Sequence, residues 1–338
     1  MSRLSRARTL LGLLRAGDAR TRLRVTRDGQ AAVRLGLGAA ALETGVLDAL
    51  ADRPSTTTEL ADRLRLREVD LLAAFLRVLA AAGLVRDGGR WALTPRGRAL
   101  VDDDLVRASH EAFAGFHTGL YRELGPLLAG GPRRRDVAER GGVIARVSAA
   151  FEPFVDAVLR ETVAQAAPRR VLDVGCGAGL QLVTMLEAAP GAEGVGVDVD
   201  VDAVILTGRT LAHRGLSGRA RVRRVDVRDL AGDEAPFDLV LLANVVHYLP
   251  PGERVALLRC LAELLTPGGT LLVVTTAATP QLTSRHFDLL LRAQEGGMEL
   301  PDVDGLVGQL RAAGLEPAAP RRIAPGTPLV AVSAVRPG

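Results

Sequence analysis

Lysine is absent from this chain of 338 residues, and aromatic residues are scarce, at 3%. No apolar run approaches the roughly 18 residues that a membrane span needs, so we expect no membrane as a partner. Only two cysteines are present, Cys176 and Cys260, and their spacing fits neither a metal site nor a disulfide framework. We therefore predict a reducing, cytoplasmic location. The His, Asp and Glu residues also lack metal-ligand spacing, so no metal is expected.

Arginine supplies every basic side chain, and the formal net charge is only +4 at pH 7. Much of this excess lies in the first 27 residues, which hold eight arginines and a single acid, Asp18. An Arg-rich, acid-poor start is compatible with an organelle transit peptide, but we favour an arm that is frayed or packs on a partner in a cytosolic protein. The rest of the chain is nearly neutral, which argues against nucleic acid as a partner.

The start of the chain has the pattern of a mainly α winged-helix domain. Apolar residues at helical spacing occupy 31–50, and Thr56 with Glu59 begins a second helix as a capping box. A third helix is predicted over Glu68–Ala82, and residues 84–94 form two short strands about an Asp-Gly-Gly turn. A winged helix that binds DNA places its third helix in the major groove. Here that helix is mainly acidic and aliphatic, so we do not expect DNA binding.

A helical stretch from Asp103 to about Gln165 separates this domain from the rest of the chain. It holds half of the ten Phe, Trp and Tyr residues, namely Phe113, Phe116, Tyr121, Phe151 and Phe154. These form either an interdomain core or the wall of a substrate pocket. We accordingly place a winged-helix domain at 1–100, a linking helical region that contributes to the pocket at 101–150, and an α/β domain at 151–338.

Short apolar runs alternate with helical segments from Arg170 onward. The predicted strands are 170–174, 194–198, 220–225, 238–243 and 270–276. A helical stretch follows at 282–314, and the final runs Pro317–Ile323 and Pro328–Val335 flank Pro325-Gly326 as an antiparallel hairpin at the sheet edge. The alternation predicts an α/β fold with a doubly wound, largely parallel sheet.

A glycine-rich turn follows the first of these strands. Gly175, Gly177 and Gly179 stand at alternate positions after Asp173. Glycines at such a turn allow positive φ and let a ligand approach the backbone closely. A dinucleotide fingerprint, G-x-G-x-x-G, would place its third glycine at the position of Leu180. The spacing therefore does not match a dinucleotide site.

The next strands end in side chains that suit a nucleoside. Asp198 and Val199 follow the second strand, where a carboxylate accepts hydrogen bonds from both ribose hydroxyls. Asp226 and Val227 follow the third, where an acid accepts from an adenine amino group and a valine covers the ring. Ligands of open α/β sheets bind at these carboxyl ends, so we expect the residues to act together.

Together with Asp173 and the G-x-G-x-G loop, these residues resemble the class I S-adenosylmethionine-dependent methyltransferases. With the winged-helix start, the whole chain is similar to the small-molecule O-methyltransferases whose N-terminal domain mediates dimerisation. The resemblance implies a Rossmann-like, seven-stranded sheet with its last strand antiparallel, S-adenosylmethionine as methyl donor, a small-molecule substrate and a homodimer formed by the N-terminal domain. It also places Asn244, after the fourth strand, near the methionine moiety of the donor.

In that family a histidine shortly after the fourth strand is the general base, and two glutamates orient it. His247 occupies this place, although the two residues after it differ from the family's Asp and Trp. One acid is missing, because residues 275–277 read Thr-Thr-Ala, and Glu299 supplies the other. An imidazole pKa near ~6.5 suits removal of a phenolic or carboxylic proton. His286 is an alternative base.

The side chains predicted to contact the substrate are Phe113, Phe116, His117, Phe154, Tyr248, His286 and Phe287. Most of these are aromatic residues of the helical region and of the segments around His247.

The reaction that these features predict is methyl transfer to an oxygen of a natural-product intermediate. The incomplete base machinery leaves N- or C-methylation, or a cofactor-assisted rearrangement, as alternatives. A winged-helix regulator that senses S-adenosylmethionine is the alternative from another class.

Overall fold

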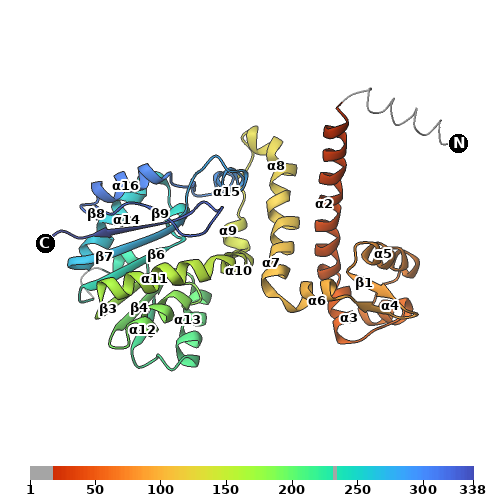
Figure 1. The fold of residues 1–338 in the computed structure, drawn as a ribbon, viewed down its shortest axis with the longest axis horizontal. Coiled ribbons are helices and arrows are strands. Elements are labelled where there is room, and N and C mark those ends of the chain that lie inside the picture. Colours follow the sequence, from red (N-terminus) through yellow and green to blue (C-terminus); the bar gives the residue numbers. More distant parts are fainter. Residues whose placement is uncertain (1–17, 231–233) are drawn as a thin grey trace. The chain divides into compact units, whose positions relative to one another are not determined.

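The computed structural model describes residues 18–230 and 234–338, arranged in two units (Figure 1). One unit contains the described residues up to Glu123 together with Gly142–Val147, and the other contains Leu124–Gly141 and Ser148–Gly338. Most of the arginine-rich arm lies outside the described residues. Within the part that the structure describes, the helices are too short or too polar to cross a membrane.

The N-terminal unit begins with the winged-helix elements, which the structure confirms with one difference. Its helices are α2 (Ala19–Glu43), α3 (Val46–Asp52), α4 (Thr57–Leu64) and α5 (Val69–Ala81), and its wing is β1 (Val85–Asp87) with β2 (Trp91–Leu93). The single helix predicted over 31–50 is wrong. It is two helices, because Gly45 has a φ of 73° and ends the first before the second begins.

The start of α4 is the predicted capping box. The hydroxyl of Thr56 accepts a hydrogen bond from the Glu59 amide at 3.2 Å, and the Glu59 carboxylate accepts from the Thr56 amide at 2.7 Å. Arg90 donates to the same carboxylate at 2.5 Å, which fastens the wing to this helix start. Leu60, Leu76 and their neighbours form the apolar core of the unit.

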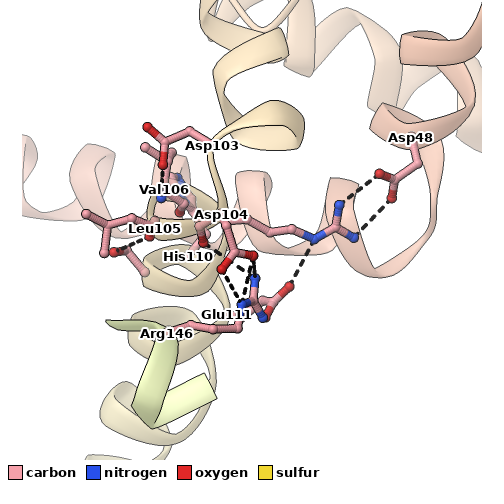
Figure 2. Close-up of polar contacts among 10 residues, drawn as sticks. Asp48, Asp103, Asp104, Leu105, Val106, His110, Glu111 and Arg146 are labelled. Atoms are coloured by element: carbon pink, nitrogen blue, oxygen red, sulfur yellow. Dashed lines mark hydrogen bonds and ion pairs between the residues drawn. The ribbon is translucent and has the colours of Figure 1, made fainter. Parts of the chain in front are cut away.

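Four further helices belong wholly or partly to the N-terminal unit as described: α6 (Pro95–Asp102), α7 (Asp104–Ala112), α8 (Thr118–Leu128) and most of α10 (Gly141–Ser148). A π-helical turn, η1 (Phe113–His117), joins α7 to α8. Figure 2 shows how ion pairs fasten α7 to its neighbours. Arg107 donates to both carboxylate oxygens of Asp48 at 2.8 and 3.2 Å, and Arg146 of α10 donates to Asp104 and Glu111 at 2.8 Å each.

The C-terminal unit contains one large sheet. Its strands are β3 (Arg170–Val174), β4 (Glu193–Asp198), β5 (Ala220–Arg224), β6 (Phe237–Ala243), β7 (Leu265–Thr276), β8 (Glu316–Pro317), β9 (Arg321–Arg322) and β10 (Leu329–Val335). The order is β5-β4-β3-β6-β7-β10-β8, and β9 also pairs with β10. The strands thus fill seven positions, parallel from β5 to β7 with β10 antiparallel to β7, as predicted.

Helices cover both faces of this sheet (Figure 1). One face packs on α14 (Pro251–Leu264) and α16 (Val303–Ala312). The other packs on α11 (Glu152–Ala166), α12 (Leu180–Ala188) and α13 (Val201–His213). Successive residues along the central strands pack into the apolar cores on opposite faces of the sheet, as Leu172 and Val171 do in β3.

Two segments of the C-terminal unit differ from the sequence prediction. The stretch 282–314 is two helices, α15 (Leu282–Arg292) and α16, interrupted around Gly296-Gly297, where both glycines have positive φ. The run 317–323 is not one strand but holds the end of β8 and the whole of the two-residue β9, because Pro320 between them lacks the amide hydrogen that a ladder needs. The short elements α9 (Asp136–Glu139) and η2 (Ala149–Phe151) precede α11.

Candidate functional site

The glycine loop between β3 and α12 has a backbone that only glycine adopts freely. Gly175, Gly177 and Gly179 have φ values of 70°, 53° and 75°. A Cβ atom on Gly175 would lie 2.5 Å from Cγ2 of Val245, and one on Gly179 would lie 2.7 Å from Cγ2 of Thr207. The loop is therefore fixed both by its conformation and by close packing.

Asp198, at the end of β4, fastens this loop to the next strand. Its Oδ2 accepts a hydrogen bond from the Gly177 amide at 3.0 Å, and its Oδ1 accepts from the Asp200 amide at 3.0 Å. The adjacent Val199 side chain is 64% exposed. The carboxylate is thus held by backbone donors at the carboxyl edge of the sheet, where a ribose is expected.

Asp173 is buried in β3 with an unsatisfied oxygen. Its Oδ2 has no hydrogen-bond partner within the described residues. Burial, reinforced by the charge of Asp198, raises the pKa of Asp173 to about 7. A buried acceptor without a donor is a feature that a cationic ligand would satisfy, and S-adenosylmethionine carries an ammonium and a sulfonium group.

Asp226 begins the turn η3 (Val227–Asp229) after β5. Its two carboxylate oxygens accept hydrogen bonds from the Arg228 side chain at 3.0 and 2.6 Å, and these bonds lower its pKa. Val227 is buried in the core. Both residues lie where the sequence placed them, but adenine would have to share or displace the half-exposed guanidinium.

Asn244 turns the chain from β6 into η4 (Val246–Tyr248). Its φ of 56° lies in the left-handed region, which asparagine tolerates better than most residues. Its amide donates to the carbonyl oxygen of Val274 in β7 at 2.8 Å. Such strain is concentrated at functional sites, and here it directs the chain that carries His247.

His247 is 2% exposed, and its Nδ1 lies 3.1 Å from Oγ1 of Thr275. Its ring centroid is 4.4 Å from that of Tyr248 and 5.5 Å, edge-on, from that of Phe287. Burial, with a smaller contribution from the charge of Arg254, lowers the pKa of His247 to about 3. The expected value near ~6.5 is therefore wrong, because sequence spacing does not report how deeply a ring is buried.

Glu299 does not make the predicted contact with His247. Its carboxylate pairs with Arg292 at 2.6 Å, and its backbone carbonyl accepts a hydrogen bond from Arg254 at 2.5 Å. The hydroxyl of Thr275, rather than a glutamate, lies within hydrogen-bond distance of Nδ1 of His247. The only sequence signal for Thr275 was the missing acid at that point in the chain.

The predicted substrate contacts fall in both units. Phe154 in α11 is partly exposed, and Tyr248 and Phe287 flank His247. His286 is half-buried, which lowers its pKa.

The remaining three predicted substrate contacts, Phe113, Phe116 and His117, lie in the N-terminal unit. The ring centroid of His117 is 4.7 Å from that of Phe113 and 4.6 Å from that of Phe116. Their contact with a substrate stays a prediction.

Two buried residues at the site were missed. Thr207 of α13 donates to the Gly177 carbonyl at 2.8 Å and so supports the glycine loop. Arg254 of α14 is 2% exposed and donates to the Leu249 carbonyl at 3.2 Å as well as to that of Glu299. Neither was found from a local pattern, since Thr207 acts on a loop 30 residues away and Arg254 reaches Glu299, 45 residues away.

Comparison with known families agrees with this geometry. Residues 171–269 match a methyltransferase domain, and residues 39–103 match an O-methyltransferase dimerisation domain. The fold and these matches define an S-adenosylmethionine-dependent methyltransferase that acts on a small molecule. The dimerisation-domain match is to the O-methyltransferases, and S-adenosylmethionine is the methyl donor.

Individual relatives differ in how much of the chain they match. The N,N-dimethyltransferase OxyT of Streptomyces rimosus is 28% identical over 76% of this chain and 78% of its own length. A ubiquinone biosynthesis O-methyltransferase of Xanthomonas axonopodis pv. citri is 36% identical, but over only 33% of this chain and 44% of its own.

Solved structures match over nearly the full length. The mitomycin 7-O-methyltransferase MmcR superposes with a TM-score of 0.78 at 21% identity, covering 95% of this chain and 99% of that one. The O-methyltransferase NcsB1 from neocarzinostatin biosynthesis, in complex with S-adenosylmethionine and a hydroxynaphthoic acid, has a TM-score of 0.65 at 25% identity and covers 90% and 96%.

Replacing Asp198 tests the ribose contact. Asp198→Ala removes an acceptor that would bind two hydroxyls, so we expect affinity for S-adenosylmethionine to fall by about 1.5–3 kcal/mol, as measured by calorimetry. Asp202→Ala, an exposed change on the adjacent helix, is the matched control and should leave affinity unchanged. Equal affinities for all three proteins, or a preference for NAD, would contradict the assignment.

The buried Asp173 predicts a pH dependence of stability. In the cofactor-free protein its pKa is about 7, whereas an unfolded aspartate titrates near 3.8. Between these values the folded state binds more protons, so stability falls as pH rises, by at most about 1.4 kcal/mol per pH unit. Thermal melts from pH 4 to 8 should show this decline for wild type relative to Asp173→Asn. Parallel melting curves for the two proteins would show that Asp173 titrates normally.

Proposed function

We propose that the enzyme transfers the methyl group of S-adenosylmethionine to a hydroxyl oxygen of a natural-product intermediate. The observation that carries this proposal is the buried His247, which follows the strained turn at Asn244 and keeps an uncharged imidazole between two aromatic rings. MmcR and NcsB1, whose folds this chain shares, are O-methyltransferases, and NcsB1 acts in natural-product biosynthesis.

The chemistry of proton removal supports oxygen over nitrogen. When a neutral hydroxyl is methylated, the developing protonated ether is a strong acid, so even an imidazole with a pKa of about 3 accepts its proton. An alkylammonium product has a pKa of about 10, as a lysine side chain does, and does not lose its proton to such a base. N-methylation remains the second candidate because OxyT, an N,N-dimethyltransferase, is similar over most of the chain.

The described residues divide the work of this reaction. The glycine loop, Asp198 and Asp173 would hold the donor, which supplies an electrophilic methyl group. The acceptor oxygen forms the new C–O bond as the C–S bond breaks, and the sulfur leaves with the electron pair as a neutral thioether. His247 takes the acceptor proton, and burial excludes water from the reacting atoms. Glu299 is not given a role in this step, since its carboxylate pairs with Arg292.

A methylation assay tests the function and the role of His247 together. Wild-type protein with ¹³C-methyl-labelled S-adenosylmethionine and a panel of phenols, carboxylic acids and amines should give one added methyl by mass, and its ¹³C shift should be that of a methoxy group. His247→Ala should lower kcat by about 10²- to 10⁴-fold with unchanged cofactor affinity, since it removes the proton acceptor.

His286→Ala is the control for this experiment, because His286 is the alternative base in the neighbouring helix α15. Because His286 is also a predicted substrate contact, we expect its replacement to weaken substrate binding but to lower kcat less than His247→Ala does. The reverse result, with loss in His286→Ala alone, would transfer the base to that helix. An N-methyl signal would overturn the oxygen assignment and favour the second candidate.

We infer that the enzyme acts as a homodimer formed by the N-terminal unit. Residues 39–103 match a dimerisation domain, and large apolar side chains are exposed there. On α5 these are Val69, Leu71 and Val78, with Leu71 68% exposed. Exposed apolar surface of this kind marks an interaction face.

Sedimentation of the full-length chain should therefore give the mass of a dimer at micromolar concentration. Leu71→Asp should shift it toward monomer, because a charge would be buried in the interface. Leu282→Asp, on a leucine of the C-terminal unit that is 82% exposed, should not. A wild-type protein that sediments as a monomer would refute the inference.

A further inference from the structure

The contact between His247 and Thr275 is a side-chain pair that no part of the established activity explains. Both residues are essentially buried, Thr275 at 0% and His247 at 2% exposure. Nδ1 and Oγ1 are 3.1 Å apart, a hydrogen-bond distance. Thr275 is the penultimate residue of β7 and His247 lies in η4, so the pair joins the turn after β6 to the end of the adjacent strand.

The direction of this hydrogen bond follows from a second contact of the threonine. The Thr275 hydroxyl donates to the carbonyl oxygen of Thr276 at 3.2 Å. A hydroxyl has one hydrogen, so its oxygen is left to act as acceptor toward His247. Nδ1 of the imidazole must then carry a hydrogen and donate it, which leaves a lone pair on Nε2.

Nε2 is the other nitrogen of the ring. Within the described residues it takes part in no hydrogen bond, whereas Nδ1 is held by Thr275. A group placed against it meets a hydrogen-bond acceptor.

The surroundings of His247 also keep the ring uncharged. Thr275 in β7, Tyr248 in η4 and Phe287 in α15 contact the ring and carry no charge. The pKa of Tyr248 is raised to about 12 by burial, so its hydroxyl keeps its proton. The charged group that acts on the ring is Arg254 of α14, a cation, which disfavours an imidazolium. Acidic Glu299 is already paired with Arg292.

We propose that Thr275 is a positioning residue that fixes His247 as the Nδ1–H tautomer, so that Nε2 accepts the proton of the methyl acceptor. This inference rests on the proposed function and deepens it. It assigns the substrate class as a neutral hydroxyl compound, which donates a hydrogen bond to Nε2, rather than a pre-formed phenolate, which has no hydrogen to donate.

The step is balanced without a further reagent. The acceptor O–H gives its proton to Nε2 as the C–O bond forms and the C–S bond breaks, and the imidazolium then releases that proton to water. The neutral surroundings and Arg254 speed this release by disfavouring the charged ring. Thr275 does not touch the reacting atoms and acts only through the orientation and tautomer of His247.

The experiment is ¹⁵N NMR of the full-length protein labelled on histidine. The chain has five histidines, and the His247→Ala spectrum identifies the signals of His247. We expect Nδ1 to carry a bonded proton and Nε2 to have the shift of an unprotonated nitrogen, with no titration between pH 5 and 9. Thr275→Val, which keeps the shape but removes the acceptor, should shift the ring toward the Nε2–H tautomer, while Thr275→Ser should restore the wild-type spectrum.

Activity gives the second measurement. Thr275→Val should lower kcat by about 10- to 100-fold with little change in KM for S-adenosylmethionine, and Thr275→Ser should recover most of the loss. An Nε2–H tautomer in wild type, titration of His247 near neutral pH, or equal effects of Val and Ser would each overturn the proposal.

A failure of the proposed function can be distinguished from a failure of this inference by the position of the methyl group on the product. If the product carries its methyl on nitrogen, the oxygen assignment falls, while the tautomer spectrum still decides whether Thr275 orients the ring. The cofactor affinity of Thr275→Val, measured by calorimetry, shows whether this variant is folded, and the wild-type and Thr275→Ser spectra keep the test decisive if it is not.

Discussion

The contact between the glycine loop and the end of β4 is the constraint on which the rest of the site depends. The Val197 carbonyl accepts hydrogen bonds from the amides of Gly175 and Cys176 at 2.8 and 3.1 Å, and Asp198 accepts from the next glycine amide. These bonds require the loop to fold back onto β4 with left-handed backbone angles. The conformation of the glycine loop is therefore set by its backbone hydrogen bonds to Val197 together with the side chain of Asp198.

Burial explains the opposite shifts of two titratable groups at this edge of the sheet. It disfavours whichever form is charged, so it raises the pKa of Asp173 to about 7 and lowers that of His247 to about 3. The same cause raises the pKa of the Cys176 thiol to about 12, which leaves it unreactive at neutral pH. Near neutral pH burial therefore keeps His247 uncharged and leaves Asp173 partly protonated, and a cationic donor would favour ionisation of Asp173.

The features that could be predicted from the sequence are those encoded locally. The strands β3 to β6 and the glycine loop follow from apolar runs and from glycines at fixed positions, and the Thr56 capping box is complete within four residues. The break at Gly45 was missed because one glycine within a helical pattern is often tolerated.

The partners of His247 were missed for a different reason. A local pattern ranks residues by type, and an acid in a loop, Glu299, looks more suited to orient an imidazole than a threonine at the end of a strand. Which of them reaches Nδ1 depends on how β6 and β7 pair and how their loops pack, and in the folded protein Arg292 has already engaged the glutamate. The low pKa of His247 was equally out of reach, since burial is a property of the whole fold.

Arg254 connects the geometry of the site with its electrostatics. Its guanidinium donates to the carbonyls of Leu249 and Glu299, so one buried side chain joins the loop after β6 to the segment before α16. A buried cation is costly unless its hydrogens are bonded, which gives these two loops a fixed separation. The same charge opposes protonation of His247. The residue that holds the loops in place thereby also keeps the imidazole neutral, which an acceptor of hydroxyl protons requires.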